Sequence, residues 1–102
     1  MKKYYHATAL KNLVSILDNG LHVGCDRITY LAETKEDAYR FIVLRCFEDI
    51  LVIEVELDET KVEETFDHNP NFFKCKAFGY PELITPDEMT NFWKFERKFE
   101  NF

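Results

Sequence analysis

The sequence is poor in the features that mark several common classes of protein. Its 102 residues include three glycines and three prolines, and none of the usual dinucleotide- or phosphate-binding motifs is present. No apolar run approaches the roughly 20 residues needed to span a membrane, and no signal peptide precedes the first predicted strand. Linkers, repeats and low-complexity segments are also missing. We therefore expect one soluble domain, residues 1–102, with no membrane partner.

Cysteine and positive charge are scarce as well. Cys25, Cys46 and Cys75 are odd in number, and their spacings are unlike those of a zinc site or a disulfide framework. We expect reduced thiols, no bound metal and a cytoplasmic location. Thirteen Lys and Arg against nineteen Asp and Glu give a net charge of −6. This balance argues against nucleic acid as a partner, because binding to its backbone needs a concentrated basic face.

Aromatic residues are plentiful for so short a chain. Hydrophobic residues make up 46% of the sequence, with ten Phe, five Tyr and one Trp. Large rings bury much area per residue, so they compensate for small size. With 31% charged residues, the composition is typical of a folded domain rather than a disordered chain.

The best-marked elements are an N-terminal strand and the helix after it. Residues 2–6 are predicted to form the strand, and Thr8 can cap the helix. Gly20 suits the left-handed position that ends the helix, and Leu21 can fold back onto its last turn. The helix presents one apolar stripe at helical spacing: Leu10, Leu13, Val14 and Leu17.

The rest of the chain mixes strands and helices without a regular βαβ rhythm, which favours an α+β fold over a doubly wound sheet. In residues 49–57 the apolar positions 51, 53, 55 and 57 alternate with Glu54 and Glu56, so this strand should be buried on one side at least. The other predicted elements are a strand at 28–32, a helix from Thr34 to Arg45, a short helix at 58–66, strand pieces at 74–80 and 82–84, and a strand or helix at 91–99.

Three residues stand out by their order and setting. His6 closes the first predicted strand, Tyr30 lies in the second, and Glu82 follows far downstream. Taken singly, a histidine at a strand end is more often a structural or surface residue, and Glu82 is one acidic residue among nineteen. The loop at residues 68–70, His-Asn-Pro, is read as a turn rather than a site.

Short motifs along residues 4–89 resemble a small ADP-ribosyltransferase-fold domain. They are Tyr-His-Ala-Thr at 5–8, Ile-Leu-Asp-Asn-Gly-Leu at 16–21, Thr-Tyr-Leu-Ala at 29–32, Asp-Ala-Tyr-Arg-Phe at 37–41 and Leu-Val-Ile-Glu-Val at 51–55. The similar branch is the His-Tyr-Glu type shared by poly(ADP-ribose) polymerases and diphtheria-like toxins. The resemblance implies a compact, split antiparallel β-sheet core with two main helices, and NAD as the substrate.

The resemblance also implies a role for each site residue. His6 corresponds to the histidine that hydrogen-bonds the adenosine-side ribose of NAD, and Tyr30 to the tyrosine that stacks on nicotinamide. Thr8 lies where the family often has a Ser or Thr near the nicotinamide amide. Glu82 corresponds to the catalytic glutamate, which holds the nicotinamide-side ribose and stabilises the positive charge that develops there.

The sequence departs from the family pattern at two places. Ala7 replaces the glycine usual after the histidine, which narrows the approach of a cofactor to the backbone. Asp87 and Glu88 compete with Glu82 for the third position. A related branch, the RNA 2′-phosphotransferases, relies on arginines near the first histidine, whereas His6 is flanked by Tyr5 and Ala7.

Three functions stay open on these grounds. The first is transfer of ADP-ribose from NAD to an unknown acceptor, such as a protein, with release of nicotinamide. The second is a non-catalytic module of the same fold that binds a nucleotide or a protein, as small anti-defence proteins of phages or mobile elements do. The third is an α+β domain without a nucleotide site.

Overall fold

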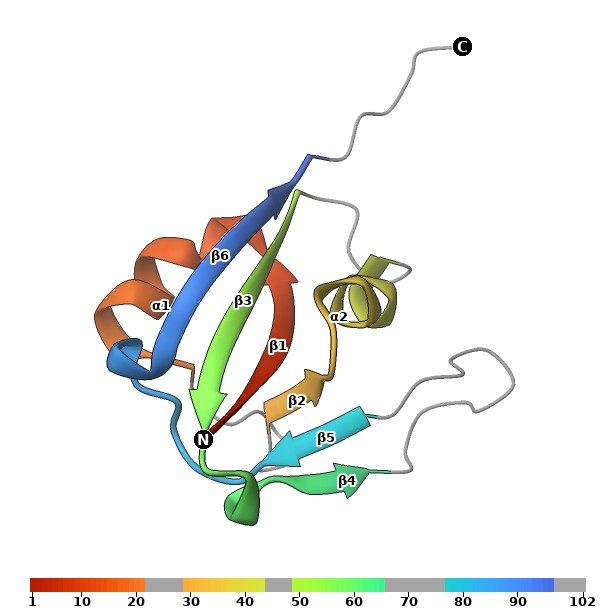
Figure 1. Cartoon of the computed structure of the whole chain (residues 1–102). Coiled ribbons are helices and arrows are strands. Elements are labelled where there is room, and N and C mark those ends of the chain that lie inside the picture. Colours follow the sequence, from red (N-terminus) through yellow and green to blue (C-terminus); the bar gives the residue numbers. More distant parts are fainter. Residues whose placement is uncertain (22–28, 44–48, 66–76, 97–102) are drawn as a thin grey trace, which may run out of the picture.

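The computed structural model describes residues 1–21, 29–43, 49–65 and 77–96. The strands in these ranges are β1 Lys2–Ala9, β2 Thr29–Ala32, β3 Ile50–Leu57, β4 Glu63–Thr65, β5 Ala77–Tyr80 and β6 Met89–Phe95. The helices are α1 Leu13–Asn19 and α2 Lys35–Val43, with 3₁₀ turns η1 Leu10–Asn12, η2 Glu59–Lys61 and η3 Pro86–Glu88. The six strands form one antiparallel sheet in the order β4-β5-β2-β1-β3-β6 (Figure 1). The expected α+β class is confirmed.

The sheet falls into two sets of three strands. All eight residues of β1 are in register with β3, which pairs with β6 on its other side. In the second set, β5 pairs with β2 and with β4. One registered pair, Tyr5 with Ala32, joins the two sets, and β2, β4 and β5 cross the direction of β1, β3 and β6 at a steep angle (Figure 1). The pairing of β1 with β2 is therefore much shorter than the pairing of β1 with β3.

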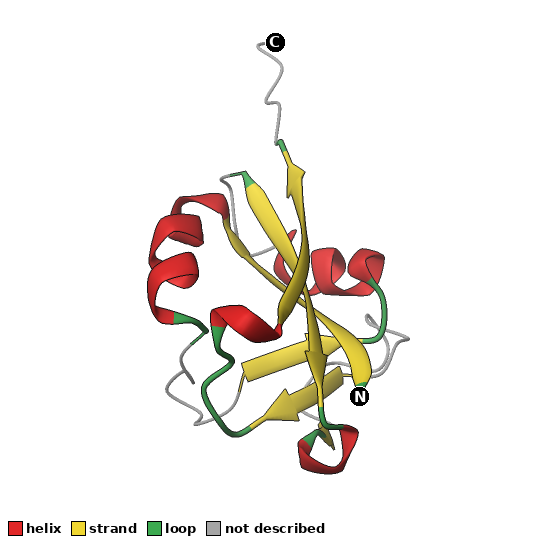
Figure 2. Ribbon diagram, turned by 60° about the vertical axis from the view of Figure 1, so that its left-hand side comes forward, coloured by secondary structure: helices red, strands yellow, loops and turns green. Residues whose placement is uncertain are grey.

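Strand β3 lies at the centre of the core and is buried on both faces, whereas the alternation in the sequence predicted burial on one side at least. Ile50 and Val52 face α2, on one side of the sheet. The other face packs toward α1 and carries Leu51, Ile53, Val55 and Leu57. The two helices lie on opposite sides of β1, β3 and β6 in both views (Figures 1 and 2). Each helix thus closes one layer of the core.

The predicted first helix begins later than expected and is rotated about its axis. Thr8 does not cap it, because β1 continues to Ala9 and Thr8 pairs with Leu51 of β3. Ile16 is the buried residue of α1, whereas Val14 is 71% exposed and Leu17 is 48% exposed. The predicted stripe was therefore wrong at Val14 and Leu17. It was right at Leu10 and Leu13, which pack against the core.

Gly20 ends α1 with a positive φ of 80°, as predicted, although its ψ of −174° is extended. Its N–H donates to the carbonyl of Ile16 at 2.8 Å. Leu21 is buried and forms a bridge with Ile84 through two backbone hydrogen bonds. A Cβ on Gly20 would lie 2.3 Å from the Ile84 carbonyl oxygen. A glycine is required at this position both by the backbone angle and by this close approach.

Residues 58–65 do not form the predicted helix. Asp58 accepts hydrogen bonds from the backbone N–H and the hydroxyl of Thr60, at 3.0 and 2.7 Å, and this closes the single turn η2. Residues 63–65 then pair with β5 as β4. The cap at Thr34 is confirmed, since its hydroxyl accepts from the N–H of Asp37 at 3.1 Å. Of the segment 91–99, predicted as strand or helix, residues 91–95 belong to β6, and residues 97–99 lie outside the described ranges.

Candidate functional site

His6 lies at the line where the two strand sets separate. It sits in the middle of β1, not at its end as predicted, and is in register with Ile53 of β3. On the side of β2, its Nδ1 lies 2.7 Å from the carbonyl oxygen of Tyr30. The structure therefore brings together the first two of the residues singled out by the sequence.

This contact fixes the chemistry of the His6 ring. A carbonyl oxygen only accepts hydrogen bonds, so Nδ1 carries the ring proton and donates a hydrogen bond to the Tyr30 carbonyl. Burial lowers the pKa of His6, and the hydrogen bond to Tyr30 opposes that shift in part. The ring is therefore neutral at pH 7, and its Nε2 is an acceptor. No described residue forms a hydrogen bond with Nε2.

The Tyr30 ring lies on the other face of the sheet. Leu31 belongs to the core on the α1 side and Ala32 to the core on the α2 side, so Tyr30, which alternates with Leu31, faces α2. His6 alternates with Tyr5, which packs on the α2 side, so its ring faces α1. The two rings therefore lie on opposite faces of the sheet, and the hydrogen bond from His6 to the Tyr30 carbonyl joins the two strands between them.

Ala7 and Thr8 line the same part of β1. Ala7 is half-buried on the α2 side, the face of Tyr30. Thr8 is half-buried on the face of His6, and its Oγ1 accepts a hydrogen bond from the side-chain amide of Asn12 at 3.0 Å. The hydroxyl proton of Thr8 therefore points away from Asn12 and can be donated elsewhere.

Glu82 is not brought to His6 and Tyr30. It follows the end of β5, its side chain is 58% exposed, and its carboxylate lies 3.5 Å from the Lys61 ammonium of η2. The pKa of the nearby Tyr80 is raised, chiefly by burial and to a lesser extent by the negative charges of Glu88 and Glu82. The pair of Glu82 and Lys61 lies at η2, the turn that follows β3, whereas His6 pairs with the middle of β3.

The two competitors of Glu82 occupy the turn η3. Glu88 accepts hydrogen bonds from the backbone N–H and the hydroxyl of Thr85, at 3.0 and 3.1 Å. It is therefore held as the cap of that turn. Asp87 is exposed. Neither of these carboxylates forms a contact with His6 or Tyr30 in the described structure.

A buried carboxylate that the sequence analysis treated as an outward polar residue is Glu54. It is 8% exposed, and it accepts hydrogen bonds from the hydroxyls of Tyr5 at 2.9 Å and Thr90 at 2.7 Å. The Lys3 ammonium lies 3.5 Å away. The pKa of Glu54 is lowered, chiefly by the Thr90 hydrogen bond. In the sequence, the alternation of apolar and polar residues places Glu54 on the face opposite the core. It does not indicate that residues of β1 and β6 cover this side chain.

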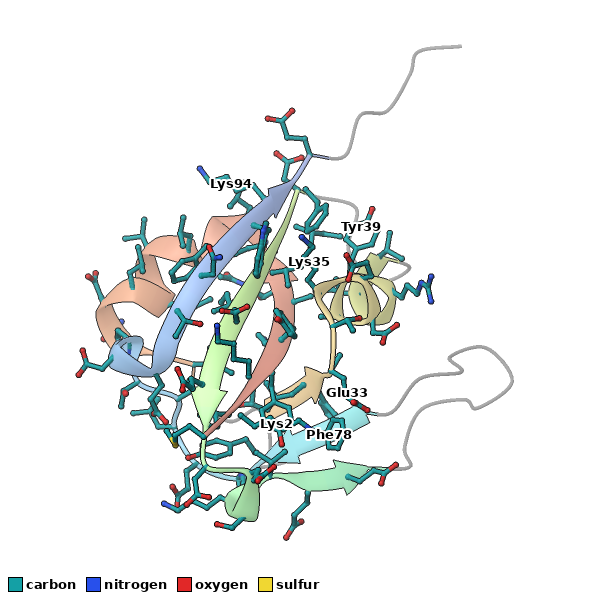
Figure 3. The ribbon with its side chains drawn as sticks, viewed as in Figure 1. Lys2, Glu33, Lys35, Tyr39, Phe78 and Lys94 are labelled. Carbon is teal, nitrogen blue, oxygen red and sulfur yellow. The ribbon has the colours of Figure 1, made fainter. Side chains whose placement is uncertain are left out.

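Aromatic rings cover the sheet beside Glu54. Trp93 lies 5.9 Å from the Tyr5 ring, and the ammonium of Lys35 stands 4.8 Å from the centre of the Trp93 ring. Tyr39, which projects from α2 like Lys35 (Figure 3), lies 4.9 Å from Phe95. Each ring has a partner, so this region holds α2 and β6 to the sheet.

Two predicted absences, of a bound metal and of a membrane-spanning segment, can be compared with the structure only over the described ranges. No group of three or more His, Cys, Asp or Glu side chains in the described ranges is arranged to hold a metal ion. No helix in those ranges is both long and apolar enough to cross a membrane. The three cysteines and the His-Asn-Pro segment at 68–70 lie outside the described residues.

Comparison with known proteins does not identify a family for this chain. No protein-family model matches the chain, and no curated protein matches it. The functional argument therefore depends on the residues and on their geometry.

Proposed function

We propose that this chain is an ADP-ribosyltransferase-like domain that binds NAD where β1 and β2 separate and transfers ADP-ribose to an acceptor, with release of nicotinamide. The observation that carries the proposal is the hydrogen bond between His6 Nδ1 and the Tyr30 carbonyl at 2.7 Å. The resemblance assigns these two residues to the ribose and the nicotinamide of one ligand. They are 24 positions apart in sequence, and they meet where β1 lies beside β2.

The state of His6 suits the ribose. A neutral ring that donates through Nδ1 offers a hydrogen-bond acceptor at Nε2, and a ribose hydroxyl is a donor. The hydrogen bond to the Tyr30 carbonyl fixes both the tautomer and the orientation of the ring. Binding therefore requires little reordering of the side chain, which favours affinity.

The surroundings of Tyr30 suit a planar ring. Tyr30 is 36% exposed, and its neighbour across the pairing of β2 with β5 is Gly79, which has no side chain. An aromatic face of this kind can stack on nicotinamide and orient it. The methyl of Ala7, on the same face, limits how closely the ligand approaches β1.

The transfer itself breaks the bond between nicotinamide and C1′ of the ribose. Nicotinamide leaves with the bonding electron pair, a nucleophilic atom of the acceptor forms a new bond to C1′, and the acceptor's proton passes to solvent. A carboxylate near C1′ stabilises the positive charge that develops there. In this proposal the carboxylate is Glu82, which must leave Lys61. An exposed ion pair contributes about 0–1 kcal/mol, so the loss of this pair costs little, and the segment that carries Glu82 must also move toward the ligand.

A second candidate is nucleotide binding without turnover. The position of Glu82 favours it, since this residue is exposed and paired with Lys61 beside η2 while His6 faces the middle of β3. A chain with a binding histidine and no carboxylate near C1′ would hold NAD and leave its glycosidic bond intact. This candidate predicts binding that depends on His6 and not on Glu82.

One experiment separates the two candidates. The purified protein is incubated with NAD labelled in the adenylate and with a cell lysate, and free nicotinamide and macromolecule-bound label are measured. Wild type is compared with Glu82→Gln and His6→Ala. The control is Glu64→Gln, which removes an exposed carboxylate that lies elsewhere, on β4. Binding of NAD to each protein is measured in parallel by calorimetry, without lysate.

The transferase predicts label and nicotinamide release that fall at least about tenfold in Glu82→Gln and stay unchanged in Glu64→Gln. Binding that is lost in His6→Ala and kept in Glu82→Gln, without release of nicotinamide by wild type, identifies the second candidate. A folded wild-type protein that neither binds NAD nor releases nicotinamide contradicts both.

A further inference from the structure

The hydroxyl of Thr29 is a buried polar group without a partner. Thr29 is the first residue of β2 and is 4% exposed. In the described part of the chain, its Oγ1 is the buried side-chain atom that makes no hydrogen bond. Burial of an unpaired hydroxyl destabilises a protein, so such groups are rare and often belong to sites.

Thr29 lies on the face of the sheet that carries the His6 ring. It alternates with Tyr30 and therefore shares the face of Leu31, which packs in the core on the α1 side. His6 shares the same face through Tyr4, and so does Thr8. These polar side chains therefore share one face of two neighbouring strands, which have a single registered pair at Tyr5 and Ala32.

We propose that Thr29 is a second ribose-binding residue, whose hydroxyl pairs with one hydroxyl of the adenosine-side diol while His6 takes the other. The inference rests on the proposed function, because it assumes that the ligand is a nucleotide. His6 Nε2 only accepts a hydrogen bond, whereas a threonine hydroxyl both donates and accepts. A vicinal diol presents two adjacent hydroxyls that can satisfy both residues at once.

The free chain covers the Thr29 hydroxyl, so binding requires a rearrangement. Rotation about χ1 exchanges the positions of the methyl and the hydroxyl of a threonine between staggered wells. The ligand then gives the hydroxyl the partner that it lacks. Removal of the hydroxyl should therefore leave the free protein as stable as wild type or more stable, and should weaken only the complex.

The experiment measures ADP-ribose binding by calorimetry and melting temperature without ligand. Thr29→Val and Thr29→Ala remove the hydroxyl by two routes, so the result does not depend on the folding of one variant, and Thr29→Ser keeps it. We expect Thr29→Val to melt at or above the wild-type temperature and to bind ADP-ribose about five- to tenfold more weakly. Thr29→Ser should bind within about twofold of wild type.

An ADP-ribose analogue whose adenosine-side ribose lacks both hydroxyls completes the test. If Thr29 contacts the diol, wild type and Thr29→Val bind this analogue equally. An equal loss for both ligands would assign Thr29 a structural role and overturn the inference, as would wild-type affinity in Thr29→Val. If wild type binds neither ADP-ribose nor NAD, the proposed function fails together with the inference; if it binds NAD alone, the Thr29 variants are compared with NAD as the ligand.

Discussion

The two strand sets of this sheet differ in length, pairing and role. β1, β3 and β6 have seven or eight residues each, whereas β2, β4 and β5 have three or four. The long set contains β3, which is buried on both faces, and one residue pair connects it to the short set. His6 belongs to the long set and Tyr30 to the short set. The proposed site thus joins a stable framework to a smaller unit that we expect to open more easily.

The comparison is tested most strongly by two substitutions of matched chemistry. Ile53 of β3 and Leu31 of β2 are both fully buried. We expect Ile53→Ala to lower the free energy of unfolding by about 3–4 kcal/mol in one cooperative transition, because it leaves a cavity in the framework. Leu31→Ala should cost about 2–3 kcal/mol and should also speed amide exchange in β2 and β5 selectively. Urea unfolding followed by the fluorescence of Trp93, with hydrogen exchange, measures both effects.

A surface substitution serves as the control for that pair. Val14 is 71% exposed on α1, and Val14→Ala should change stability by less than about 0.5 kcal/mol. Equal losses for Ile53→Ala and Leu31→Ala, with the same change of exchange rates in both strand sets, would mean that the sheet opens as one unit. The distinction between the two sets would then be wrong.

An effect of about the same size as that of Leu31→Ala is expected at the junction of α1 with the segment that carries Glu82. Gly20→Ala forces a side chain onto a φ of 80° and places its Cβ 2.3 Å from the Ile84 carbonyl oxygen. We expect a loss of about 2–3 kcal/mol, because the chain must move apart at the bridge between Leu21 and Ile84. Thermal or urea unfolding measures it.

Asn19→Ala, one residue earlier at the exposed end of α1, is the matched control and should cost less than about 0.5 kcal/mol. A Gly20→Ala protein as stable as wild type would show that the bridge does not constrain the backbone. Because Glu82 lies two residues before Ile84, the same variant should also change nicotinamide release, if the transferase proposal is right.

The features that were predicted from the sequence are those set by neighbouring residues. The positive φ of Gly20, the cap at Thr34 and the burial of β3 follow from local backbone chemistry and from alternation. The end of β1 does not, because Thr8 belongs to the strand only when the long partner β3 lies beside it. The same holds for residues 63–65, which became a strand by pairing with β5.

The site was predictable only in part, for the same reason. Chain order identified His6 and Tyr30, but the hydrogen bond between them depends on how β2 lies beside β1. No pattern along the chain sets the direction in which Glu82 leaves β5, and its pairing with Lys61 depends on the turn after β3. The buried state of Glu54 likewise comes from Tyr5 and Thr90, which lie far from it in sequence.

The smallest expected effect distinguishes two positions of the long set by pH. The folded-state pKa of Glu54, in the long set, is lowered chiefly by the Thr90 hydrogen bond, so the unfolded chain binds the proton more readily. Its contribution is complete above the unfolded pKa of about 4.3 and is lost as the pH falls through the lower folded pKa. The pKa of His6, on β1 of the same set, is also lowered, by burial, so its contribution is lost as the pH falls from about 6.5.

The curve of stability against pH should therefore fall in two separate windows. Glu54→Gln should cost about 1–2 kcal/mol at pH 7 and should flatten only the window below about pH 4.3, because it removes the carboxylate that Thr90 and Tyr5 hold. Glu56→Gln removes a carboxylate from the same face of β3 without these hydrogen bonds and is the control. His6→Gln should flatten only the upper window. Urea unfolding at half-unit steps of pH measures the curves, and a Glu54→Gln curve parallel to wild type in acid would contradict the role of the Thr90 hydrogen bond.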